Sequence, residues 1–250
     1  MARVLAVAGK GGTGKTTFNA LLVKYLLEKE KGTILAVDAD ANANLNEALG
    51  LERELTIADV LSDVKDGAAI PKGMSKEAYV QFRLSQAVIE TPKLDLLVMG
   101  RPQGPGCYCY ANTLLKGYLE NLGRSYDFLI VDNEAGMEHI SRRTIERPDD
   151  LFLTSDASMR GIRSARRIYD LIQEMKIPVG RVHLVVTMTR SEDWVKVLQE
   201  FKGVDINFLG DIPYDPIVAA YDEEGKPLLH LPQEAGSVAA VNKMLDSILG

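Results

Sequence analysis

The sequence predicts an α/β fold built on a mostly parallel sheet of seven to eight strands, with helices on both faces. Short apolar runs recur along the chain, and most are continuous rather than alternating, which is typical of strands buried on both faces. Stretches with apolar residues at helical spacing lie between most of these runs, and such an alternation favours parallel pairing. The 250 residues are 46% hydrophobic, enough for one sizeable core, so we expect a single domain over 1–250.

The expected strands are the apolar runs at 4–8, 33–38, 94–100, 127–132, 150–155, 182–187 and 206–213. The clearest helical patterns are those at 17–30, 163–176 and 237–249. In such sheets ligands bind beyond the carboxyl ends of the strands. The residues that follow each strand are therefore the first candidates for a functional site.

Residues 51–93 form a charged, mostly helical stretch that is long for a plain connection between two strands. We interpret it as a helical insertion in the domain. It is either an extra pair of surface helices or a mobile lid or partner-docking segment, because loops near the active edge of a sheet often carry function.

The overall charge and the cysteine count limit the class of protein. The chain has 29 Lys and Arg against 35 Asp and Glu, a net charge of −6, so we expect no nucleic-acid partner. No apolar run approaches the ~20 residues of a membrane span, and the start, MARVLAVAGKGG, becomes glycine-rich too soon for a secretory signal. Two cysteines without an export signal predict a cytoplasmic protein, and we expect no membrane partner.

The stretch GKGGTGKTT directly follows the first strand and opens the first helix. It fulfils the phosphate-loop pattern G-x-x-x-x-G-K-[ST], in which backbone N–H groups and the helix N-terminus surround phosphate oxygens. Lys15 is expected to reach the β- and γ-phosphates of ATP, and Thr16 to ligate Mg²⁺. The alternative is a glycine-rich turn that binds nothing. The expected nucleotide-binding residues of the loop are Gly9, Lys10, Gly11, Gly12, Thr13, Gly14, Lys15, Thr16 and Thr17.

Lys10 is a second lysine that an ordinary phosphate loop does not need. With it, the loop resembles the deviant Walker A motif of the family that contains MinD, ParA, the nitrogenase iron protein and the arsenite-pump ATPase. The resemblance implies a P-loop NTPase fold of the deviant Walker A type and an ATP-sandwiched homodimer. It also implies that Lys10 crosses to the phosphates of the partner subunit and serves catalysis together with Lys15. The alternative is a solvated loop lysine.

Two aspartates follow the second strand in VDADANANL, with Asp38 at its end and Asp40 two residues further. Phosphoryl transfer needs a held Mg²⁺ and a group that orients the attacking water. The resemblance assigns Asp40 to the water as a catalytic residue and places Asp38 near the metal shell. The alternative is a pair of turn-forming aspartates at a strand end.

Asp132 ends the strand FLIVD, the usual place of a Walker B aspartate, and is expected to bind the Mg²⁺-nucleotide. Many relatives read D-x-P-A-G here, whereas this chain has Glu134 in place of the proline. The backbone N–H of Gly136 is still expected to contact the γ-phosphate. His139, which follows on the same segment, is either a metal relay or, as is more usual for a lone histidine, structural.

The pocket for the nucleotide base has a weaker signature. Relatives usually place an asparagine after the sixth strand, and this chain has TMTR at 187–190 instead. The stretch GDIPYDP is more similar to the family's second base-side loop. It makes Pro213 and Tyr214 the candidates for contact with the base.

Arg160, Arg163 and Arg167 lie at spacings of three and four, on one face of a helix. In a chain of net negative charge we favour a solvated face or a docking site for an acidic partner over DNA binding. The C-terminal helix has a single lysine, Lys243, opposed by Asp246. That composition differs from the basic membrane helix that ends MinD relatives.

Both cysteines of the chain, Cys107 and Cys109, lie within GPGCYCYAN after the third long strand. Two thiolates are half of the four ligands that a zinc-type ion takes. Because a two-fold axis brings the same surface together twice, the implied homodimer would supply four. We therefore expect Cys107 and Cys109 to bind Ni²⁺ or Zn²⁺ across the dimer. A buried or incidental pair of cysteines is the alternative.

The phosphate loop, GPGCYCYAN and DNEAGMEHISRR together resemble the CooC-type nickel-insertion ATPases. This resemblance implies a Mg²⁺-ATP-dependent metallochaperone ATPase that assists nickel insertion into its client, carbon monoxide dehydrogenase or acetyl-CoA synthase. The main alternative is a ParA- or MinD-like switch that recruits partners to DNA or membrane. A third is a reductive activator whose thiolates carry a redox cluster. Thiolates bind nickel and zinc alike, so the ion and the client stay open.

Overall fold

A seven-stranded sheet forms the centre of the protein, in the order β3-β2-β4-β1-β5-β6-β7. The computed structural model describes residues 2–40, 42–66, 70–101, 117–119, 121–133, 147–190 and 192–250. In this part of the chain every pair of neighbouring strands is parallel, which confirms the α/β class and the lower of the two predicted strand numbers. The strands are β1 (Arg3–Gly9), β2 (Ile34–Asp38), β3 (Leu94–Val98), β4 (Phe128–Asp132), β5 (Asp150–Asp156), β6 (Arg181–Thr189) and β7 (Asn207–Pro213).

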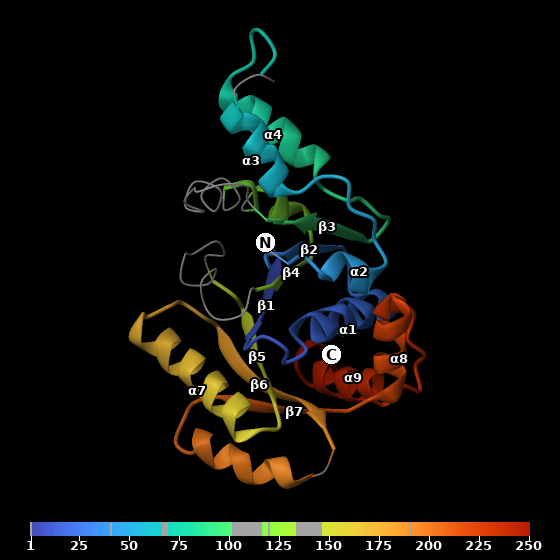
Figure 1. Ribbon diagram of the computed structural model, residues 1–250. Helices are drawn as coiled ribbons and strands as arrows, with labels where there is room; N and C mark the ends of the chain where they lie inside the picture. Colours follow the sequence, from blue (N-terminus) through green and yellow to red (C-terminus); the bar gives the residue numbers. More distant parts are fainter. Residues whose placement is uncertain are drawn as a thin grey trace.

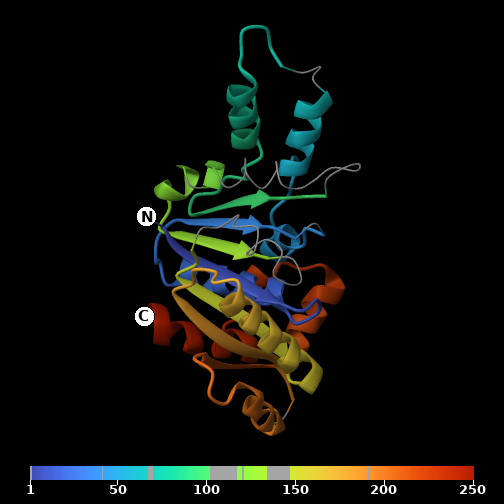
Figure 2. The ribbon, with the colours of Figure 1, turned by 90° about the vertical axis from the view of Figure 1, so that its left-hand side faces the viewer.

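Helices cover both faces of the sheet (Figure 1). One face carries α1 (Lys15–Glu28), α2 (Leu45–Leu49), α8 (Pro216–Glu224) and α9 (Gly236–Leu249). The other face carries α3 (Ile57–Asp66), α4 (Lys76–Gln86) and α7 (Met159–Glu174). Three short 3-10 segments complete the described elements, η1 (Gly123–Ser125), η2 (Glu192–Phe201) and η3 (Leu228–His230). The strands in Figure 2 all point the same way, so their carboxyl ends lie along one edge of the sheet.

The central strand β1 shows why its apolar run is continuous. Leu5 and Val7 pack in the hydrophobic layer under α1, whereas Ala6 and Ala8 face the layer under α7. Successive side chains of a strand point to opposite faces, and here both faces are covered. The sequence therefore shows no alternation of polar and apolar residues, as is typical of parallel sheets.

Two helices begin earlier than their apolar patterns predict. The helix expected at 17–30 begins at Lys15, because Gly14 takes the left-handed conformation (φ 72°) that precedes the first turn. The helix expected at 163–176 begins at Met159, because the hydroxyl of Ser158 accepts a hydrogen bond from Gly161 N at 3.0 Å. The N-cap serine is a sequence signal that the apolar spacing alone misses.

The stretch 51–93 contains the helical pair α3 and α4, which extends beyond the β3 edge of the sheet (Figures 1 and 2). Ile57 and Val60 of α3 and Tyr79 of α4 are buried in one hydrophobic layer with strands of the sheet. Arg83 of α4 donates to Asp63 of α3 at 2.7 Å. The base of the pair is thus packed on the sheet, as expected of surface helices.

The C-terminal helix α9 packs against α1 and β7. Val238, Val241 and Leu245 of α9 are buried in the layer under α1. Within the residues that the structure describes, no helix is both long enough and apolar enough to cross a membrane.

A charged network closes the amino-terminal end of the sheet, opposite the strand ends that carry the candidate site. Asp150 of β5 is fully buried and accepts hydrogen bonds from Arg3 (2.8 Å), Arg181 (2.8 Å) and His183 (2.8 Å). Burial by itself would raise the pKa of Asp150, but the hydrogen bonds from His183, Arg3 and Arg181 outweigh it and hold the pKa below its ordinary range. The network joins β1, β5 and β6.

We expect Asp150→Ala to lower the free energy of unfolding by about 1–3 kcal/mol, because it leaves buried donors without an acceptor. Asp150 has a lowered pKa in the folded state, so its contribution is present above the unfolded pKa of about 3.9 and is lost as the pH falls. Urea unfolding at pH 7 and at about pH 3, below the unfolded pKa, measures both effects. Nucleotide binding should persist in the folded variant, and equal stability of variant and wild type at pH 7 would contradict the assignment.

Candidate functional site

The loop between β1 and α1 has glycines where side chains would not fit. Gly12 (φ 79°) and Gly14 (φ 72°) take left-handed conformations, which cost little only for glycine. A Cβ on Gly9 would lie 2.4 Å from Thr154 Oγ1 and 2.5 Å from the Thr154 carbonyl oxygen. The loop therefore approaches β5 more closely than any other residue at position 9 allows.

Hydroxyl groups from neighbouring strands hold the same loop in place. Thr13 Oγ1 lies 2.7 Å from the Lys10 carbonyl oxygen and 2.9 Å from Thr154 Oγ1 of β5. Thr187 of β6 donates to the Thr13 carbonyl oxygen at 3.0 Å. Thr187 is the first residue of the segment TMTR, near the end of β6, which has no asparagine for binding the base. In this chain it supports the phosphate loop instead.

Lys15 is the second notable feature of the loop. Only 8% of this residue is exposed, and among the described residues no hydrogen-bond or ion-pair partner of its ammonium group is found. A buried, unpaired ammonium group is unfavourable, and this one lies at a helix N-terminus, where anions bind. The arrangement fits a bound phosphate, whereas Lys10 on the same loop is exposed to solvent.

A set of hard oxygen ligands lies beside Lys15. Thr16 donates to Asp132 Oδ2 at 2.8 Å. Only 1% of Asp132 is exposed, and its Oδ1 atom is buried without a hydrogen-bond partner in the described part of the chain. A hydroxyl and an incompletely paired carboxylate suit Mg²⁺, which prefers oxygen ligands and binds proteins through one or two carboxylates. The residues present thus fit this ion.

Asp38 and Asp132 form a pair of buried carboxyl groups, because β2 and β4 place them opposite each other. Burial raises the pKa of Asp132 to about 7, and the Asp38 charge adds to the rise against the opposing effects of Thr16 and Lys15. Burial likewise raises the pKa of Asp38 to about 6. In the protein without ligands, both groups favour the protonated form more than ordinary aspartates do.

Asp38 also shapes the segment that follows β2. Its two carboxyl oxygens accept hydrogen bonds from Asp40 N at 3.1 Å and Leu45 N at 2.9 Å. The side chain of Asp40 is only partly buried and accepts from Asn42 N at 2.8 Å. Asp38 therefore acts on the turn, and Asp40 is the carboxylate of this turn that solvent can reach.

A cavity of about 590 Å³ opens beside Thr16 and Thr17. Its volume lies within the range of small-molecule sites. The other walls come from α2 and the segment after it, and from the carboxyl end of α8. Sequence reasoning missed these walls, since apart from Asn44 they lie outside the quoted motifs. They comprise Asn44, Asn46, Glu47, Ala48, Gly50, Leu51, Glu52, Tyr221, Asp222, Gly225, Lys226, Pro227 and Leu228.

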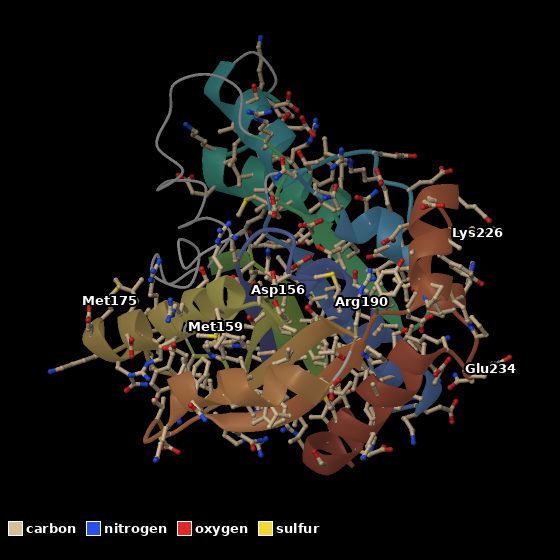
Figure 3. All side chains as sticks on the ribbon, turned by 60° about the horizontal axis from the view of Figure 1, so that its bottom comes forward. Asp156, Met159, Met175, Arg190, Lys226 and Glu234 are labelled. Atoms are coloured by element: carbon tan, nitrogen blue, oxygen red, sulfur yellow. The ribbon has the colours of Figure 1, made fainter. Side chains whose placement is uncertain are left out.

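The candidate base-side residues lie at the ends of β6 and β7. Tyr214 is 44% exposed, and the guanidinium carbon of Arg190 lies 4.3 Å from the centre of its ring. Pro213 precedes Tyr214 at the end of β7. Neither Pro213 nor Tyr214 lines the cavity. Figure 3 shows Arg190 well separated from Lys226, which marks the far end of α8.

The arginine face of α7 is only partly free. Arg160, Arg163 and Arg167 are all exposed, and Arg163 pairs with Glu200 of η2 at 3.2 Å. Met159 and Met175 mark the two ends of this helix in Figure 3. Both methionines are exposed, so the face has apolar as well as basic character.

Several predicted site residues lie outside the described residues. These are Gly136 and His139 on the segment after β4, and Cys107 and Cys109 on the segment after β3. Within the described ranges, no group of three or more His, Cys, Asp or Glu residues could hold a metal ion. The metal assignment of the two cysteines therefore stays a prediction from sequence.

Comparison with known proteins groups this chain with nucleotide-binding proteins, in agreement with the phosphate loop. The family model described as the CobQ/CobB/MinD/ParA nucleotide binding domain matches residues 4–228. An uncharacterised ATP-binding protein of Methanocaldococcus jannaschii is 39% identical over 249 residues, 98% of each chain. Carbon monoxide dehydrogenase accessory protein CooC of Rhodospirillum rubrum is 30% identical over 233 residues, 88% of this chain and 87% of its own.

Among solved structures, the septum site-determining protein MinD of Pyrococcus horikoshii, complexed with Mg-ADP, superposes with a TM-score of 0.72. The match covers 100% of this chain and 96% of that one, at 21% identity. At this identity the likeness shows the fold.

We expect Asp132→Asn to make the ligand-free protein more stable at high pH. Because the pKa of Asp132 is raised in the folded protein, its contribution to the free energy of unfolding is greatest below the unfolded pKa of about 3.9. That contribution is lost as the pH rises through about 7. The stability difference between variant and wild type should therefore grow by about 2–3 kcal/mol from pH 5 to pH 8.

Urea unfolding without Mg²⁺ or nucleotide measures this difference. Asp170→Asn is the control, because Asp170 lies on α7 in a half-exposed ion pair with Arg166. If the free energy of unfolding of Asp132→Asn and of wild type depends on pH in the same way, Asp132 ionises in the folded protein as easily as in the unfolded chain, and the prediction is wrong.

Proposed function

The chain belongs to the CobQ/CobB/MinD/ParA nucleotide-binding domain family, and on that premise we propose that it is a Mg²⁺-ATP-dependent, dimerising metallochaperone ATPase. Its proposed task is to assist nickel insertion into carbon monoxide dehydrogenase or acetyl-CoA synthase. The observation that carries the ATPase assignment is the mostly buried Lys15, for which the described residues provide no hydrogen-bond or ion-pair partner, beside the Thr16–Asp132 pair. The nickel assignment rests on Cys107 and Cys109 and on the similarity to CooC.

In the proposed site, the loop from Gly9 to Thr17 surrounds the phosphates, and Lys15 neutralises the β- and γ-oxygens. Thr16 and Asp132 hold Mg²⁺, with Asp38 nearby. The ion supplies charge stabilisation on the phosphates. The backbone N–H of Gly136 is proposed to contact the γ-phosphate.

Asp40 is the proposed water-orienting residue. Its carboxylate is on the turn that Asp38 fixes through Asp40 N and Leu45 N. The Asp38 hydrogen bonds restrict the turn, so the Asp40 carboxylate needs little reorganisation to hold a water in line with the γ-phosphate.

The nucleoside end of ATP is proposed to occupy the cavity beside Thr17. This cavity begins where the phosphate loop ends and contains hydrogen-bonding groups on both walls, such as Glu47 of α2 and Asp222 of α8. Carboxylates there can accept hydrogen bonds from ribose hydroxyls. Pro213 and Tyr214 do not line this cavity, so they are the alternative candidates for contact with the base, at the end of β7.

The homodimer is proposed from Lys10, which is exposed to solvent in the single chain. In the ATP-bound dimer it would reach the phosphates of the partner subunit. The same dimer would bring two pairs of Cys107 and Cys109 together, which gives four thiolates for one Ni²⁺ or Zn²⁺. The metal ion is then cargo, held in the closed dimer and released after hydrolysis.

A second candidate function is a MinD- or ParA-like switch whose ATP-bound dimer recruits partners to DNA or membrane without metal delivery. The basic and apolar face of α7, with Arg160 and Arg167 exposed, is the observation that favours it. The two functions differ in their requirement for metal. Dimerisation that depends on nickel or zinc supports the metallochaperone, and ATP-dependent retention on DNA or lipid supports the switch.

We expect Asp40→Ala and Lys10→Ala to have opposite effects on the dimer. Asp40→Ala should bind ATP and accumulate as a dimer, with turnover lowered about 10²-fold or more because the water loses its orienting group. Lys10→Ala should bind ATP but stay monomeric, since its own phosphate cradle is intact. Light scattering with ATP, together with phosphate release, separates the two outcomes. Identical behaviour of the variants would refute the division of roles.

We expect one metal ion per dimer, held by Cys107 and Cys109 of both chains. Replacing either cysteine by serine removes half of the thiolates and should abolish bound metal and metal-dependent dimerisation. ATP binding should persist, because Lys15 and Thr16 are unchanged. Metal analysis of size-separated fractions, with wild type as the control, gives the stoichiometry. One ion per monomer, or full metal content in the serine variants, excludes the shared site.

A further inference from the structure

Asn19 is a polar side chain inside the hydrophobic layer under α1. The residue is 0% exposed, and both its amide nitrogen and its amide oxygen lack a hydrogen-bond partner among the described residues. Buried amides are almost always paired, so an amide with neither atom satisfied needs an explanation. None of the motifs in the sequence includes this position.

The neighbours of Asn19 on α1 show which way it faces. Thr16 reaches β4 by its hydrogen bond to Asp132, and the ring of Phe18 lies 5.1 Å from that of Phe152 on β5. Asn19 follows Thr16 by three residues and Lys15 by four, so it lies on the same side of the helix one turn further on. It therefore points at the sheet, between β1 and β4.

The layer that Asn19 enters is lined by apolar side chains of the sheet, with polar groups at the strand ends. Val7 of β1 and Ile130 of β4 face α1 there. Asp132 follows Ile130 by two residues and so faces the same side, as Asp38 does two residues after Ala36. The Asp132 carboxyl is the polar group at the end of β4, the strand that Thr16 contacts, one step toward the phosphate loop.

Each of the two side chains has the hydrogen-bonding atom that the other needs. Among the described residues, Asp132 Oδ1 is a buried acceptor without a donor, and Asn19 Nδ2 is a buried donor without an acceptor. Asn133 adjoins Asp132, but it is not the donor for Asp132 Oδ1, because its amide nitrogen already donates to the Val7 carbonyl oxygen at 2.8 Å. Both carboxyl oxygens of Asp38 already accept hydrogen bonds from backbone N–H groups of its own turn, so Asp38 is a less suitable acceptor for Asn19.

We propose that Asn19 is a positioning residue for Asp132, and that its amide N–H donates to Asp132 Oδ1 when Mg²⁺-nucleotide occupies the site. The inference rests on the proposed Mg²⁺-nucleotide function. In the ligand-free protein the Thr16 hydroxyl holds Asp132 by one oxygen only. Mg²⁺ at Thr16 would weaken that bond, and the amide of Asn19 then fixes the orientation of the carboxylate from below.

This role explains why an amide stands at this position. A second-layer donor of this kind orients a ligating carboxylate and raises metal affinity. Leucine has the same number and branching of side-chain heavy atoms as asparagine, and no hydrogen-bond donor. Asn19→Leu therefore removes the hydrogen bond without opening a cavity. Asn19→Asp places a third carboxylate beside Asp132 and Asp38.

The test compares wild type with Asn19→Leu, Asn19→Asp and Asn19→Ser, using ADP and Mg²⁺ as the probes. Thermal unfolding at fixed ADP is followed over a Mg²⁺ titration, with ADP binding by calorimetry as a second readout. We expect Asn19→Leu to melt at or above the wild-type temperature without Mg²⁺, since it loses an unpaired buried amide. Its half-maximal Mg²⁺ concentration should rise about 10- to 100-fold.

Asn19→Ser retains a hydroxyl donor and should recover part of the Mg²⁺ affinity, whereas Asn19→Asp should lose more than Asn19→Leu. A merely structural role predicts changes in melting temperature with an unaltered Mg²⁺ requirement. Leu22→Ala, one turn further along the buried face of α1, is the control for packing effects alone.

The outcomes separate this inference from the proposed function. A wild-type protein that shows no Mg²⁺-dependent effect of ADP overturns both. A wild type that responds, with Asn19→Leu responding at the same Mg²⁺ concentration, overturns the role of Asn19 alone. In side-chain amide NMR spectra, a shift of the Asn19 resonance on addition of Mg²⁺ to the ADP complex supports the new hydrogen bond, and an unmoved resonance opposes it.

Discussion

Buried charge next to the phosphate loop is the constraint on which the rest of the site depends. Parallel pairing of β2 with β4 puts Asp38 opposite Asp132, and the start of α1 brings Lys15 and Thr16 against them. Asp38, Asp132 and Lys15 are buried, and Asp132 Oδ1 has no partner among the described residues, which is unfavourable in the protein alone. A ligand that carries both an anion and a cation relieves the imbalance. A Mg²⁺-nucleotide has this composition, and the stability lost without it is the usual cost of a prepared site.

The two sides of β1 contribute different chemistry to the loop. Toward β4 and β2 the neighbours are carboxyl groups, which suit a metal ion. Toward β5 and β6 they are the hydroxyls of Thr154 and Thr187, which bind the loop at Thr13 without adding charge. The contacts of the loop itself are therefore charged on the β4 side and uncharged on the β5 and β6 side.

The parts of this arrangement that are local in sequence could be predicted, and the parts made by distant residues could not. The phosphate loop and the aspartates that end β2 and β4 follow from spacing and from apolar runs. Thr187 contacts a loop 174 positions away, and the walls of the cavity come from α2 and α8, so no short pattern contains them. Asn19 was hidden for another reason. Its neighbours in sequence, Phe18, Ala20 and Leu21, are apolar, and an amide there resembles an ordinary interruption until its lack of partners among the described residues is seen.

Any output of the protein requires that ATP favour one global state over another, since a ligand with equal affinity for both shifts nothing. Lys15, Thr16 and Asp132 are already assembled within one subunit, so in the proposed function they would bind nucleotide equally in a monomer and in a dimer. Lys10 differs, because it is exposed and unused in the single chain. A residue that gains a phosphate partner only when a second subunit closes supplies the differential contact that the coupling needs. The same reasoning applies to a metallochaperone and to a recruiting switch, because both depend on the energy of closure rather than on that of nucleotide binding alone.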